Sequence, residues 1–203
     1  MIHLNSNILC TVCIDTTGEI VGIHDLIQIC ILPLNFTIDP NPNILPFDCI
    51  LKPERFFDDP SIKIRRREKL AKCITSGLDP LIASDLLMQW FKSLNLPEGK
   101  KIMPLSFSWA NQKAFIAEWL GMSTFNYIFD YRYRDILTTA LYLNDKADVE
   151  IEQCPFPKVD LTYLCKTLKL DFEADHQVDV TYDCGIVAAA YKQLLKIQIG
   201  IFG

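Results

Sequence analysis

The chain has 203 residues, a length that suits one globular domain over residues 1–203. Hydrophobic residues make up 50% of it and charged residues 22%, which excludes a disordered chain, a collagen-like repeat and a coiled-coil rod. The net charge of −5 disfavours a protein that coats nucleic acid mainly with Lys and Arg, although a carboxylate-held metal supplies positive charge locally.

In chain order, the first half predicts three strands. Apolar runs at residues 8–14, 26–34 and 45–52 are separated by turn-forming residues such as Asp15-Thr-Thr-Gly18. Because the connections between these runs are short, we expect an antiparallel meander. None of the runs is long enough to span a bilayer, and the N-terminus lacks the basic segment of a signal peptide. We therefore expect a cytoplasmic protein without a membrane partner.

The second half predicts helices that alternate with strands. Asp79-Pro80 is typical of a helix start, and apolar residues recur at helical spacing from there to residue 94. The further expected elements are a strand at 101–107, a helix at 111–120, a strand at 125–129, and helices at 133–143, 161–170 and 183–197. The predicted fold is α/β, with a mixed five-stranded sheet flanked by helices. Its first three strands are antiparallel and its last two parallel.

Eight cysteines lie mostly inside apolar runs, at residues 10, 13, 30, 49, 73, 154, 165 and 184. We interpret them as buried free thiols, because a chain of this length does not need disulfide bonds. Cys10 and Cys13 have the spacing of a CxxC pair, but residues three apart on a strand point to opposite faces. A zinc or redox protein is therefore the weaker alternative.

Four short stretches of sequence follow one another along the chain. Val-Cys-Ile-Asp-Thr-Thr-Gly (residues 12–18) ends the first expected strand. The third expected strand is followed by Lys-Pro-Glu-Arg (52–55) and then by Ile-Thr (74–75). After the fifth expected strand, Arg-Asp-Ile-Leu (134–137) opens a helix. This series, over residues 8–197, resembles the DEDD 3′–5′ exonucleases (DnaQ-like and RNase T-like) of the RNase H-like fold, whose first motif is Asp-x-Glu-Thr-Thr-Gly.

The resemblance implies metal-dependent hydrolysis of phosphodiester bonds at 3′ ends. Such enzymes use four carboxylates to hold two Mg²⁺ or Mn²⁺ ions about 3.5–4 Å apart, together with a His or Tyr base. Carried over to this chain, carboxylates remain at Asp15 and Asp183, the candidate catalytic and metal-binding residues. The other two acidic positions fall on Cys13 and Gln112, and the base of the histidine subclass falls on Val178.

Two residues shortly before Asp183 offer substitutes for the lost groups. His176 is a candidate base, and Asp179 is a candidate base or extra metal ligand. The alternatives are an exposed loop histidine and a capping or solvated carboxylate. We interpret Asp130 and Asp135, which flank the fifth expected strand, as helix-capping residues rather than catalytic ones.

Two stretches are candidate contacts for nucleic acid. One is the first motif, through Thr16 and Thr17. The other is the basic run at residues 63–69, which either guides a phosphate backbone or forms a solvated helix face. Its three consecutive arginines are Arg65, Arg66 and Arg67.

A neutral thiol or amide cannot replace the charge that holds two dications together, so we expect hydrolysis to be weakened or lost. One hypothesis is a diverged 3′–5′ exonuclease-like protein that acts on or binds the 3′ ends of single-stranded DNA or RNA, with weakly bound Mg²⁺ or Mn²⁺ if active. The alternative is a catalytically inactive module, without a cofactor, that binds nucleic acid or docks a partner protein. Whether the chain is an enzyme stays open at this point.

Overall fold

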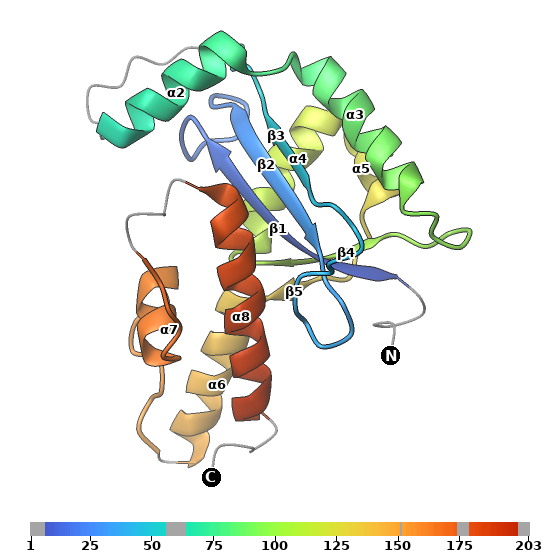
Figure 1. The fold of residues 1–203 in the computed structure, drawn as a ribbon. Coiled ribbons are helices and arrows are strands. Elements are labelled where there is room, and N and C mark those ends of the chain that lie inside the picture. Colours follow the sequence, from blue (N-terminus) through green and yellow to red (C-terminus); the bar gives the residue numbers. More distant parts are fainter. Residues whose placement is uncertain (1–6, 56–63, 151, 174–178, 199–203) are drawn as a thin grey trace.

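A computed structural model describes residues 7–55, 64–150, 152–173 and 179–198, and its centre is a five-stranded sheet of order β3-β2-β1-β4-β5 (Figure 1). The strands are β1 (Ile8–Thr16), β2 (Leu26–Pro33), β3 (Phe47–Ile50), β4 (Ile102–Ser106) and β5 (Arg134–Asp135). β2 pairs antiparallel with β1 and β3, whereas β4 pairs parallel with β1 and β5. The predicted fold class, an α/β fold with a mixed sheet, is confirmed.

Helices cover both faces of the sheet (Figure 1). One face packs against α6 (Ile136–Glu150), α7 (Leu161–Thr167) and α8 (Val180–Gln198). The other packs against α3 (Pro80–Ser93), α4 (Trp109–Leu120) and α5 (Met122–Ile128). α2 (Ile64–Ser76) lies instead near the end of the sheet at which β1 finishes and β2 begins (Figure 1). Among the described helices, none is long and apolar enough to cross a membrane.

The alternation of side chains along β1 assigns its residues to two separate cores. Leu9 and Cys13 pack on the α8 side, whereas Cys10 and Val12 pack on the side of α3 and α4. Cys10 and Cys13 therefore do not converge on one metal ion. All eight cysteines are free, and seven of them are buried, as the sequence predicts.

The fifth strand was predicted at the wrong place. Phe125 to Ile128 lie in α5, and the sheet ends instead at the two-residue β5, with a single bridge between Phe129 and Ile102. The aromatic rings explain the difference: Phe125 stacks on Phe129 with ring centroids 5.0 Å apart, and both rings contact Trp109. A short apolar run of this kind fits a buried helical turn as well as it fits a strand.

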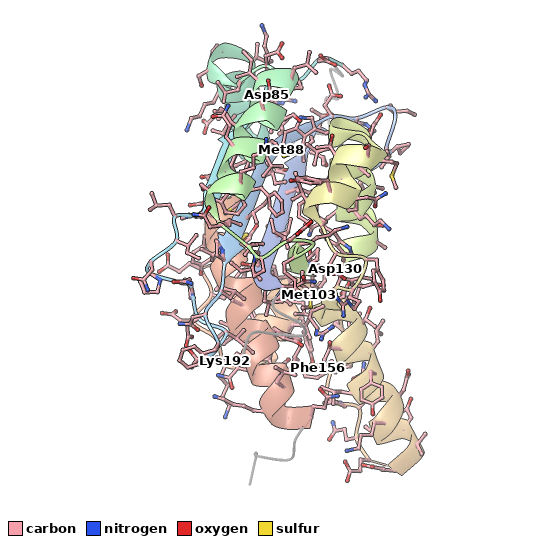
Figure 2. All side chains as sticks on the ribbon, turned by 90° about the vertical axis from the view of Figure 1, so that its right-hand side faces the viewer. Asp85, Met88, Met103, Asp130, Phe156 and Lys192 are labelled. Atoms are coloured by element: carbon pink, nitrogen blue, oxygen red, sulfur yellow. The ribbon has the colours of Figure 1, made fainter. Side chains whose placement is uncertain are left out.

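Asp135 and Asp130 stabilise the corners around β5. Asp135 Oδ1 accepts a hydrogen bond from the backbone N–H of Leu137 at 2.9 Å, in the first turn of α6, so the capping prediction is confirmed for this residue. For Asp130 the capping prediction is wrong. Its carboxylate accepts hydrogen bonds from Arg132, at 2.9 Å from Nε, and from Asn7. Figure 2 shows Asp130 beside β4, and its backbone N–H donates to the carbonyl of Ile102.

The carboxylate of Asp130 predicts a loss of stability in acid. Hydrogen bonds from Arg132, with a further one from Asn7, lower the pKa of Asp130 from 3.8 to about 2, against the opposing effect of burial. Because the pKa is lower in the folded state, the stabilisation is present above about pH 4 and is lost as the pH falls toward 2. Urea denaturation should show Asp130→Asn to be less stable than wild type at pH 6, with the difference shrinking at pH 2.5. A difference independent of pH would contradict this assignment.

Candidate functional site

The candidate site lies where β1 ends, beside the first turn of α8 and below α2 (Figure 1). Asp15 is two residues after Cys13, so the alternation of β1 directs both side chains to the α8 side. Asp183 stands in the first turn of α8, next to Cys184, whose thiol donates to the carbonyl of Cys30 at 3.4 Å. The fold thus places Asp15 at the end of β1 and Asp183 in the first turn of α8, the helix that packs against β1.

Asp183 is half-buried, and its ionisation is unfavourable. Burial is the main cause that raises its pKa, to about 7. The positive charge of Lys69 lowers the pKa, whereas the negative charges of Asp179 and Asp15 raise it further. At neutral pH the carboxyl group of Asp183 is therefore only partly charged.

Lys69, on α2, supplies a positive charge to the same site. Its Nζ lies 2.8 Å from Asp15 Oδ2, and the two side chains are only 9% and 18% exposed. The other oxygen, Asp15 Oδ1, accepts a hydrogen bond from the backbone N–H of Thr16 at 2.9 Å. Both oxygens of the Asp15 carboxylate thus have partners within the chain.

Of the two positions that lack carboxylates, Cys13 is buried and Gln112 is half-buried. Cys13 is 5% exposed and lies opposite Cys30 in the register of β1 and β2. The amide of Gln112 is directed to the main chain just before α4: its Nε2 donates to the carbonyl of Phe107 at 2.9 Å. Its Oε1 is buried and accepts no hydrogen bond from the described residues. Neither side chain carries negative charge at the position where the resemblance expects it.

The threonines of the first motif hold the turn between β1 and β2. Thr16 Oγ1 donates to the carbonyl of Gly18 at 2.6 Å, and Thr17 Oγ1 accepts from the backbone N–H of Asp25 at 2.8 Å. A side chain at Gly18 would collide with the ring of His24, which explains the glycine in this turn. These contacts give Thr16 and Thr17 a structural role, and their contact with nucleic acid stays a prediction.

Asp179 caps α8. Its Oδ1 accepts hydrogen bonds from the backbone N–H groups of Thr181 and Tyr182, at 2.9 and 3.3 Å. This is the capping alternative that the sequence left open. The negative charge of Asp179 also raises the pKa of Asp183. His176 and Val178 lie outside the described residues, as do the side chains of Arg65 and Arg66. Arg67 is exposed on α2.

Sequence reasoning missed the role of Lys69, because it treated residues 63–69 as one basic run. A signal was available: Cys73 lies four residues after Lys69, so the two share one face of α2. Cys73 is fully buried, and its thiol donates to the carbonyl of Ile27 in β2 at 3.7 Å. A buried residue one turn away marks Lys69 as facing the sheet rather than solvent.

The residues of the site do not fit a two-metal centre. Such a centre needs several anionic oxygens free to bridge two cations. Here one carboxylate is paired with Lys69, and two of the four positions are a thiol and an amide. Within residues 7–55, 64–150, 152–173 and 179–198, no three His, Cys, Asp or Glu side chains are arranged to hold a metal ion.

No family model and no curated protein matches the sequence. Solved structures do match. A structure of the yeast NOT1 MIF4G domain co-crystallised with CAF1 has a TM-score of 0.66 at 12% identity and covers 94% of this chain and 80% of the matched chain. The nuclease domain of 3′hExo, a DEDDh family member bound to rAMP, has a TM-score of 0.60 at 15% identity, covering 97% and 94%.

Exonuclease I of E. coli, in a zinc-bound complex with single-stranded DNA, has a TM-score of 0.62 at 15% identity. The match covers 96% of this chain but only 41% of the exonuclease I chain. At such low identities these similarities establish the fold alone. The chain has the DnaQ-like fold of the 3′–5′ exonucleases, as its motifs predict.

Proposed function

We propose that this chain binds the 3′ ends of single-stranded nucleic acid on an exonuclease scaffold and hydrolyses phosphodiester bonds weakly or not at all. The observation that carries the proposal is the buried thiol of Cys13. It faces α8 from β1, two residues before Asp15, where the first motif of the exonucleases has an aspartate. A neutral thiol in this position removes the charge on which two-metal hydrolysis depends.

Two features support retention of nucleic-acid binding. The turn that follows Asp15 is intact, because Thr16, Thr17 and Gly18 are held by the hydrogen bonds and close packing described above. The basic run continues into α2 beside this turn, with Arg67 exposed. Positive charge at this place attracts a phosphate backbone, although the chain as a whole is negative. Two of the matched structures, those of 3′hExo and exonuclease I, contain rAMP and single-stranded DNA.

The test compares binding with hydrolysis on the same oligonucleotides. We expect labelled single-stranded DNA or RNA with a free 3′ hydroxyl to bind, in fluorescence anisotropy, more tightly than the same strand blocked by a 3′ phosphate. On gels, we expect no release of nucleotides with Mg²⁺ or Mn²⁺. Release at the rate of an active exonuclease, lost in both Asp15→Asn and Asp183→Asn, would overturn the proposal.

A charge-reduced variant tests where the strand lies. Changing Arg65, Arg66 and Arg67 together to alanine should weaken binding of every sequence and flatten its salt dependence, by a slope of up to about 2 for three lost phosphate contacts. The matched control changes three exposed lysines on the α6 and α7 side, Lys146, Lys158 and Lys166. Equal loss in the two triple variants would show that only overall charge matters.

The second candidate function is docking of a partner protein. The outer side of α3 exposes three large apolar side chains: Leu81 is 78% exposed, Ile82 55% and Leu86 40%. One of the matched structures is itself a protein complex, that of NOT1 with CAF1. A chain that binds no oligonucleotide in the experiment above, but whose apolar side chains on α3 bind another protein, would favour this function.

A further inference from the structure

Asp15 and Lys69 form an ion pair that is largely shielded from solvent. The separation of 2.8 Å between Nζ and Oδ2 is that of a charge-assisted hydrogen bond. Both side chains are largely shielded from solvent, at 9% and 18% exposure, so salt screens their attraction less than that of a surface pair. The ammonium group therefore neutralises the carboxylate that ends β1.

α2 is fixed against the sheet on the side from which Lys69 extends. One turn after Lys69, Cys73 donates its thiol hydrogen to the carbonyl of Ile27. At the C-terminal end of α2, Leu78 donates to the carbonyl of Ile50 at 2.9 Å and accepts from the N–H of Lys52 at 2.8 Å. These main-chain contacts hold the helix so that Lys69 is directed at Asp15.

The second carboxylate of the site, Asp183, lies in the first turn of α8. The thiol of the adjacent Cys184 contacts the carbonyls of Thr11 in β1 and Cys30 in β2, which holds this turn against the sheet. The site holds a cation of its own, placed among the carboxylates that the exonuclease resemblance assigns to metal ions. A divalent ion at Asp15 would lie a few ångströms from an ammonium group and would be repelled by it.

We propose that the ammonium of Lys69 takes the place of a divalent cation at Asp15 and closes this site to Mg²⁺ and Mn²⁺. The proposal concerns the charge balance of the site, so it does not depend on whether the chain binds nucleic acid. Lys69, the last residue of the basic run, thus acts at the carboxylate site and not on a solvated face of the helix.

A titration with Mn²⁺ alone tests this proposal, with unbound Mn²⁺ followed by electron paramagnetic resonance. Wild type and Lys69→Arg, which keeps the charge, should show no saturable binding at the site. Lys69→Met should show saturable binding of Mn²⁺, and Asp15→Asn added to Lys69→Met should abolish this gain. Tight binding by wild type, or no gain in Lys69→Met, would overturn the proposal.

A measurement on the wild-type chain covers the case in which Lys69→Met does not fold. Acetylation of amines, followed by mass spectrometry, compares buried Lys69 with exposed Lys72 on the same helix. Lys69 should react at least tenfold more slowly than Lys72, both without metal and with 10 mM Mn²⁺. If Mn²⁺ raised the reactivity of Lys69 to that of Lys72, the ion would be displacing the ammonium group, and the proposal would be wrong.

Discussion

Lys69→Met should lower the free energy of unfolding by about 3 kcal/mol, because it leaves the shielded carboxylate of Asp15 without its cation. The substitution also makes the ionised form of Asp183 less favourable, because the charge of Lys69 lowers the pKa of this carboxyl group. Urea denaturation at pH 7 measures the effect. Methionine is unbranched and only one heavy atom shorter than lysine, so it keeps most of the apolar stem and the loss reports mainly the charge.

A double-mutant cycle separates this pair from general damage to α2. Asp15→Asn removes the negative charge, so Lys69→Met should cost much less in the Asp15→Asn background than in wild type. We expect a coupling free energy of about 2 kcal/mol between the two positions. Simple additivity of the two substitutions would mean that the ion pair contributes nothing to stability, and would contradict its role in the site.

Gly77→Ala should also destabilise the chain by about 3 kcal/mol. An added Cβ would lie 2.3 Å from the carbonyl oxygen of Cys73 and 2.6 Å from the backbone nitrogen of Lys52. Both neighbours are main-chain atoms, so no side chain can move aside, and either α2 or the end of β3 must shift. Because Gly77 joins α2 to the sheet, the same shift should disturb the ion pair of Lys69.

The matched control is Gly185→Ala, in the second turn of α8. An added Cβ there meets no heavy atom within 4 Å, and alanine favours a helix over glycine by up to about 1 kcal/mol. Thermal unfolding of the two variants should therefore move in opposite directions. A Gly77→Ala protein as stable as wild type would show that α2 is not tightly seated on the sheet.

Much of the fold was predictable because local signals and tertiary packing agree. Asp79-Pro80 marks the start of a helix, and in the structure Asp79 caps α3 by accepting a hydrogen bond from Leu81 at 2.8 Å. The alternation of β1 correctly separates Cys10 from Cys13. Residues 125–129 were predicted wrongly because their aromatic side chains pack against Trp109 from a helix, which a short apolar pattern does not reveal.

The candidate site was predictable only in part. The order of motifs located Asp15 and Asp183 on neighbouring elements, and the same alignment showed that Cys13 and Gln112 are not acidic. It could not reveal Lys69, because the direction of that side chain depends on how α2 is seated through Cys73 and Gly77. A lysine inside a basic run has the same local pattern whether it faces solvent or a carboxylate.

The most direct test of the central claim is anomalous diffraction from crystals soaked in Mn²⁺. We expect no manganese peak between Asp15 and Asp183, with Lys69 Nζ still about 2.8 Å from Asp15 Oδ2. A pair of peaks about 3.5–4 Å apart at these carboxylates, with Lys69 turned away, would be the two-metal arrangement of an active exonuclease and would contradict it.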